Sequence, residues 1–196
     1  MDEFVLAGLL AEVGLRFVGW IDPATPLIPP RLATFAGSSS SEDDAYGDAV
    51  ALDDPELRAK ANATWYQLAS RARLFDSVDK RFLTAIKSDD EGRGLWWAVV
   101  ELRDVWDIVG AGAASQLFGY RENRPAFVMI SVDGNVVLRC DVGEVSIDFS
   151  VVPDARRAPT LLRRARRIVE TASGDDGTRS AAERWLGVVE QEASAT

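Results

Sequence analysis

Small residues are concentrated at one point of the chain, in the segment GAGAAS that begins at Gly110. Gly110, Gly112 and Ser115 stand at the spacing of a phosphate-binding turn, in which small residues let the backbone come close to a bound phosphate. If a helix begins at Ala113, the amide groups of its first turn would face that phosphate. The chemistry that this pattern indicates is the binding of a phosphorylated cofactor.

The string IVGAGAAS resembles the phosphate-binding turn of Rossmann-type flavin and nicotinamide enzymes, and the resemblance covers this one turn. It implies a strand over residues 105–109, a pyrophosphate against the turn, and Asp133 as the acidic residue that binds the ribose. Ser115 stands where that pattern has its third glycine, which allows close packing of helix on strand. The other segments predict helices and an antiparallel hairpin rather than further parallel strands. Binding of a flavin or nicotinamide dinucleotide is therefore the alternative hypothesis.

Composition excludes several kinds of catalysis. The 196 residues include 31 acidic and 22 basic side chains, one cysteine and no histidine. Without histidine the chain cannot form a Ser-His-Asp or Cys-His arrangement or a histidine-ligated zinc site. The formal net charge of -9 disfavours binding to nucleic acids, because their phosphates bind lysine and arginine. The expected partner is a basic or neutral protein.

The N-terminal segment predicts neither a signal peptide nor a membrane helix. It opens with Asp2 and Glu3, whereas a signal peptide opens with positive charge, and no apolar run reaches about 18 residues. A single cysteine agrees with a reducing compartment, so we expect a cytoplasmic protein. None of the acidic segments has the spacing of an EF-hand loop, so no metal site is predicted.

The clearest elements that could position a site are three antiparallel strands between residues 126 and 152. FVMISV and NVVLRCDV flank the turn residues Asp133 and Gly134, and EVSIDFSVV alternates strictly. The same residues face the core in both hairpins, and Cys140 is a small core residue. The predicted pairs are Phe127 with Cys140, Met129 with Leu138, Cys140 with Val145, Leu138 with Ile147, and Val136 with Phe149.

Helices are predicted on both sides of this meander. Their apolar spacing indicates buried faces, including Phe4 in the first helix. A mobile loop rich in proline, serine and acidic residues is expected over about 23–54. The sequence thus predicts one α+β domain over residues 1–196, in which helices from both ends pack on an antiparallel β-meander of three or more strands. The predicted helices cover residues 2–14, 55–75, 77–87 and 95–109, with two more from Pro159 and Thr178.

The segment 95–109 contains two adjacent tryptophans, Trp96 and Trp97. As a helix it would be apolar nearly all round, so it would either lie inside the core or offer its second face to a partner. A strand over residues 95–102 is the alternative, and it would extend the meander. Asp104 and Asp107 lie one helical turn apart in the same segment.

The leading functional hypothesis is a non-enzymatic protein-binding module, for example an inhibitor or immunity-type protein that occludes a partner enzyme or toxin. Such a protein needs shape and charge but no catalytic residue. Six arginines between residues 156 and 167 either pair with the protein's own carboxylates or form a patch for an acidic partner. The predicted partner-binding residues are Trp96, Trp97, Asp104, Asp107, Arg163 and Arg167.

Overall fold

The structure is a computed structural model in which residues 2–37, 43–87, 94–171 and 176–195 are described. The strands are β1 (Leu15–Trp20), β2 (Tyr46–Ala51), β3 (Arg81–Lys87), β4 (Leu95–Leu102), β5 (Gly119–Arg121), β6 (Arg124–Pro125), β7 (Phe127–Ile130), β8 (Val137–Val142) and β9 (Ser146–Val152). The helices are α1 (Glu3–Glu12), α2 (Pro30–Ala33), α3 (Leu57–Ala72), α4 (Gly110–Ala114), α5 (Pro159–Thr171) and α6 (Asp176–Ser194).

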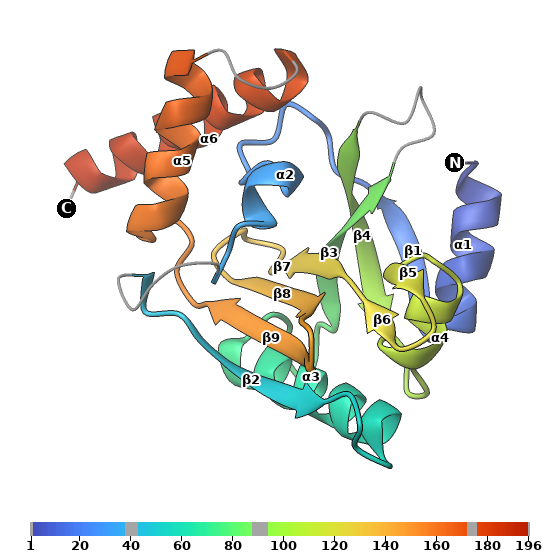
Figure 1. The fold of residues 1–196 in the computed structure, drawn as a ribbon. Helices are drawn as coiled ribbons and strands as arrows, with labels where there is room; N and C mark the ends of the chain where they lie inside the picture. The colour runs from blue at the N-terminus through green and yellow to red at the C-terminus, as the bar shows by residue number, and fades with distance from the viewer. Residues whose placement is uncertain (1, 38–42, 88–93, 172–175, 196) are drawn as a thin grey trace.

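The predicted α+β fold with an antiparallel sheet is confirmed (Figure 1). Seven strands form one antiparallel sheet in the order β1-β4-β3-β7-β8-β9-β2, and β5 and β6 pair separately. A first core, which includes Leu6 and Trp65, lies between the sheet and helices α1 and α3. A second core, which includes Leu161 and Trp185, lies between the sheet and helices α2, α5 and α6. Helices from both ends of the chain therefore cover the sheet, one set on each face.

The first predicted hairpin has the expected register, because Phe127 pairs with Cys140 and Met129 with Leu138. Its turn is longer than the two residues expected, since β7 ends at Ile130 and β8 begins at Val137. The side chain of Ser131 explains the difference. Its Oγ accepts the amide of Val136 at 3.0 Å and donates to Asp133, which stabilises a wider loop.

The second hairpin pairs Cys140 with Phe149, and not with Val145 as predicted. Val145 lies exposed in the turn before β9. The shift is by an even number of residues, so Ile147 and Phe149 still face the first core. Cys140 is buried there as predicted, and burial raises the pKa of its thiol well above the ordinary value.

Two of the predicted helices are strands. Residues 77–87 contain β3, and residues 95–109 contain β4, which is the alternative considered for that segment. In β3, Phe82 and Ile86 face the first core while Leu83 faces the second. A strand with both faces buried lacks the apolar-polar alternation that identifies a half-buried strand, so its apolar spacing also fits a helix.

The expected loop over residues 23–54 contains regular structure, because α2 and β2 lie within it. Residues 38–42 of that loop lie outside the described residues. The segment before β2 is tied to the C-terminal helices, since Oδ1 of the buried Asp43 accepts the amide of Thr160 in the first turn of α5 at 2.8 Å. Its carboxylate thereby caps a helix that is remote in the sequence.

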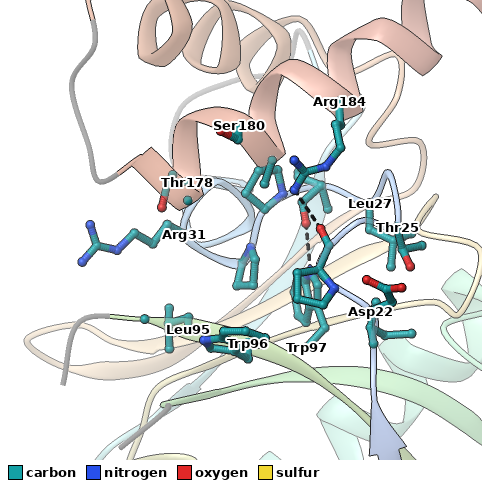
Figure 2. A pocket seen from close by; sticks show the side chains of 18 residues that line it. Asp22, Thr25, Leu27, Arg31, Leu95, Trp96, Trp97, Thr178, Ser180 and Arg184 are labelled. Atoms are coloured by element: carbon teal, nitrogen blue, oxygen red, sulfur yellow. Dashed lines mark hydrogen bonds between the residues drawn. The ribbon is translucent and has the colours of Figure 1, made fainter. Parts of the chain in front are cut away.

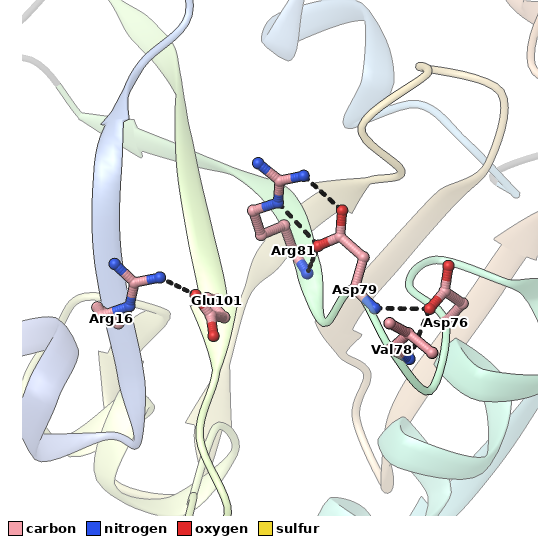
Figure 3. Close-up of polar contacts among 6 residues, drawn as sticks. All are labelled: Arg16, Asp76, Val78, Asp79, Arg81 and Glu101. Atoms are coloured by element: carbon pink, nitrogen blue, oxygen red, sulfur yellow. Dashed lines mark hydrogen bonds and ion pairs between the residues drawn. The ribbon is translucent and has the colours of Figure 1, made fainter.

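A row of charged side chains crosses β1, β4 and β3 where the sheet faces solvent (Figure 3). Arg16 forms an ion pair with Glu101. On the next strand, Arg81 binds the carboxylate of Asp79 through two nitrogens, at 2.8 and 2.5 Å. These hydrogen bonds from Arg81 lower the pKa of Asp79 from 3.8 to about 2.

We therefore expect the Asp79 carboxyl to titrate near 2 in the folded protein, with its stabilising effect present above pH 3.8 and lost as the pH falls through about 2. In an Arg81→Gln protein its pKa should rise toward 3.8. The measurement is a carboxyl carbon NMR titration. Arg16→Gln is the control, because Arg16 pairs with Glu101 and should leave the Asp79 pKa unchanged.

Candidate functional site

The structure separates the residues that were predicted to bind a partner. Trp96 and Trp97 lie at the start of β4, whereas Asp104 and Asp107 follow its other end, on the order of 20 Å away along an extended strand. Arg163 and Arg167 lie on α5. The predicted set is therefore not one site, and its parts have to be considered separately.

The segment GAGAAS does not form the strand-turn-helix that the cofactor hypothesis implies. Its first five residues make up the short helix α4, which ends before Ser115, and the described residues 105–109 form no strand. Asp107 precedes this helix and accepts the amides of Gly110 and Ala111, both at 2.9 Å. The first two amide groups of the segment therefore already bind a carboxylate of the chain itself.

Two side chains of α3 complete the environment of Asp107. Asn62 Nδ2 donates to its carboxylate at 2.6 Å, and Arg58 forms an ion pair with it. Burial raises the pKa of Asp107, but the hydrogen bonds from Arg58, Asn62 and the α4 amides outweigh burial, so the pKa lies below its ordinary value. Asp107 thus holds α3 and α4 together as an ionised group.

The small residues of α4 have a packing role. A Cβ atom at Gly112 would lie 2.8 Å from the ring of Phe118, and one at Gly110 would collide with Arg58. The hydroxyl of Ser115 donates to the carbonyl of Gly112 at 3.1 Å. Asp133 binds Asn135 and Ser131 in the β7-β8 turn. These contacts account for the segment without a cofactor and do not favour dinucleotide binding.

The arginines of α5 also contact the protein itself. The guanidinium of Arg164 lies 3.9 Å from the ring centroid of Phe35, and Arg166 lies 3.5 Å from Glu190 of α6. Arg163 donates to Thr160 at 3.3 Å. Arg167 is exposed on the same helix. The run of arginines therefore contributes to packing and ion pairs around α5.

A cleft of about 420 Å³ opens beside Trp96 (Figure 2). Its walls come from residues 21–31, which run from the end of β1 into α2, from the start of β4, and from residues 177–184 of α6. Most of the lining is apolar, including Leu27, Pro30 and Leu95. Asp22, Arg31 and Arg184 carry the charges around it. We call this hollow the Trp96 cleft.

Two hydrogen bonds hold the proline-rich wall of the Trp96 cleft. Trp97 Nε1 donates to the carbonyl of Ile28 at 2.8 Å, and Arg184 donates to the carbonyl of Pro23 at 2.7 Å (Figure 2). Prolines lack an amide proton, so a segment rich in them forms few backbone pairs of its own, and its carbonyls need other donors. Donors from β4 and α6 thus fix this wall against the rest of the molecule.

The two tryptophans have different environments although they are adjacent. Trp97 is 6% exposed and belongs to the second core, with its indole at the floor of the Trp96 cleft. Trp96 is 41% exposed and lies along the cleft. A half-exposed indole beside an apolar hollow can bind an apolar side chain, while polar groups around it set the orientation of the bound group.

Most residues of the Trp96 cleft were not predicted from the sequence. The prolines at 23, 26, 29 and 30 were the available signal, but they contributed only to the prediction of a mobile loop. Helix α6 forms another wall of the cleft, and it follows about 80 residues after β4 in the sequence. A single sequence does not reveal where such a distant helix packs.

Within the described ranges, no helix is both long and apolar enough to cross a bilayer, and no three metal-ligating side chains converge. Comparison of the chain with protein-family models, with curated proteins and with solved structures finds no significant match.

Proposed function

We propose that the protein is a non-enzymatic protein-binding module that holds an apolar side chain of its partner in the Trp96 cleft. The observation that supports this is the 41% exposed indole of Trp96 beside a largely apolar hollow of about 420 Å³. Tryptophan is enriched among the residues that dominate binding energy, and such residues lie at apolar pockets. The wall is held by hydrogen bonds from Trp97 and Arg184, so little ordering is needed on binding.

The partner is a basic or neutral protein. A net charge of -9 attracts a basic protein at long range and repels an acidic one. The association rate should therefore fall as salt is added, while the dissociation rate should depend mainly on contacts in the cleft. An inhibitor or immunity-type protein that covers the active site of a partner enzyme or toxin is the most specific form of this proposal. Binding alone performs that function.

The test is the effect of Trp96→Ala on binding to a partner purified from the source cells with the tagged wild-type protein. Loss of a hot-spot indole should weaken affinity roughly 30-fold or more, measured by calorimetry. The control is Val78→Ala. Val78 is exposed just before β3, whose other end pairs with Trp96, so this substitution should leave affinity within about twofold. Equal binding by the Trp96→Ala protein would place the partner elsewhere and contradict the proposal.

A further inference from the structure

Helix α1 has apolar residues on two opposite faces. Leu6, Leu10 and Val13 are fully buried in the first core. At about 100° per residue, Phe4, Gly8 and Ala11 share the face that points away from that core. Phe4 is 86% exposed, and Gly8 and Ala11 are exposed as well. The prediction that Phe4 is a core residue is therefore wrong, and a surface helix normally has polar residues in these positions.

This exposed face continues into a hollow at the C-terminal end of α1. The hollow measures about 370 Å³, and Ala11, Val105 and Trp106 are among the residues that line it. Val105 is 86% exposed, and the ring of Trp106 stacks on Tyr66 with their centroids 5.4 Å apart. Ala11 belongs to both parts, so they form one surface. We call it the α1 surface, and it consists of Phe4, Gly8, Ala11, Val105 and Trp106.

The charged groups around the α1 surface are mostly acidic. Asp2 and Glu3 lie beside Phe4, Glu12 lines the hollow, and the side chain of Asp104 is 98% exposed next to Val105. Helix α1 itself contains no basic residue; the basic residues nearby are Arg103, which lines the hollow, and Lys80, which lies 3.3 Å from Asp104. A ligand for this surface must therefore combine apolar groups with positive charge.

These charges decide between three possible occupants. An anionic membrane surface would be repelled by the carboxylates. A second copy of the chain would place the same acidic residues opposite one another. A basic amphipathic helix would present lysine or arginine to the acidic rim and apolar side chains to Phe4 and Val105.

The dimensions of the α1 surface also suit a helix. The 10 residues of α1 extend over about 15 Å, which allows a second helix to lie alongside. A Cβ atom at Gly8 would meet no other atom within 4 Å, so there is room for a large side chain of the partner above that glycine. Ridges of one helix pack into such gaps of another.

We propose that the α1 surface binds an amphipathic helix of a partner protein that has lysine or arginine beside its apolar residues, with one large apolar side chain over Gly8. This site differs from the Trp96 cleft, because none of the five residues of the α1 surface lines that cleft. A failure of either proposal therefore leaves the other standing.

The test uses two fluorescein-labelled peptides with the same helical pattern of leucines, one with lysine and one with glutamate in the remaining positions. Fluorescence anisotropy should show that the full-length protein binds the lysine peptide and binds the glutamate peptide at least tenfold more weakly. Phe4→Ala should weaken binding of the lysine peptide at least tenfold, because it removes the exposed ring. Gly8→Leu should weaken it to a similar extent by filling the space above the helix.

A thermal melt separates this effect from misfolding. Gly8→Leu should raise the melting temperature, because leucine favours an exposed helix interior more than glycine does. Gly187→Ala in α6 is the matched control, since a Cβ atom there also meets nothing within 4 Å. It should raise the melting temperature and leave peptide binding unchanged.

Four results would overturn this inference. The first is no binding of the lysine peptide, and the second is equal binding by wild type, Phe4→Ala and Gly8→Leu, which would indicate charge attraction alone. The third is Phe4-dependent binding to phosphatidylserine vesicles, which would assign the surface to a membrane. The fourth is Phe4-dependent dimerisation in sedimentation experiments, which would assign it to a second copy.

Discussion

Replacing Asp107 by alanine should lower the free energy of unfolding by about 2–4 kcal/mol, measured by urea denaturation. The carboxylate accepts the amides of Gly110 and Ala111 and the side-chain amide of Asn62. Its removal leaves these donors without a partner in a partly buried position, and it also removes the ion pair with Arg58. Leaving several partly buried donors without an acceptor costs more unfolding free energy than losing a single surface contact.

Asp104→Ala is the matched control for this substitution. The side chain of Asp104 is 98% exposed and lies 3.3 Å from Lys80, so its loss should change stability by at most about 0.5 kcal/mol. Asp107→Asn should be intermediate, because it keeps an acceptor oxygen and loses the charge opposite Arg58. If Asp107→Ala were as stable as Asp104→Ala, Asp107 would not hold α3 and α4 together.

The contribution of Asp107 should also depend on pH. Its pKa is lowered in the folded protein, so the stabilisation is fully present above the ordinary value of 3.8 and is lost as the pH falls through the folded-state pKa. The difference in unfolding free energy between wild type and Asp107→Ala should therefore shrink in acid. Denaturation curves at neutral pH and at acidic pH test this.

The sequence predicted the sheet best where local signals and packing agree. In β8 and β9 one face of each strand is largely apolar and the other is more polar, so alternation identified both strands and the face toward the first core. The hairpin residue Gly134 has φ +75°, which agrees with the predicted turn position, but the loop length depended on the hydrogen bonds of Ser131. Local patterns thus determined the strands more reliably than their connections.

The strands for which a helix or a loop was the leading prediction lack such a signal. Strands β3 and β4 are buried between two cores, and their apolar spacing fits a helix as well as a strand. The edge strand β2 has the sequence YGDAVA, whose small and acidic residues predicted a loop. It forms because all six of its residues pair with β9, a contact between segments about 100 residues apart.

The assignment of β4 as a strand changes the functional prediction. In the predicted helix, Trp96 and Trp97 both fell among charged residues, and either was a candidate for the interface. In a strand, adjacent side chains point to opposite faces, so one indole can be core while the other is exposed. The sequence offered both tryptophans as partner-binding residues, and the structure exposes only Trp96, so the prediction now applies to that residue alone.

Substitution of these two tryptophans should therefore have unequal effects on stability. Trp97 is 6% exposed and packs in the second core, so Trp97→Ala should lower the free energy of unfolding by about 3–5 kcal/mol. It also leaves the carbonyl of Ile28 without its donor and loosens the proline-rich wall. Urea denaturation is the measurement.

Trp96→Ala should lower stability by only about 1–2 kcal/mol, because the indole of Trp96 is 41% exposed and leaves a smaller cavity in the protein. At temperatures where both proteins are folded, both substitutions should weaken binding of the partner. Trp96→Ala removes a contact with the partner, and Trp97→Ala displaces the proline-rich wall. Only Trp96→Ala can assign a loss of binding to the cleft, since Trp97→Ala also weakens the fold. Equal destabilisation by both substitutions would mean that Trp96 is a core residue, and the cleft would then lack the exposed indole on which the proposed function depends.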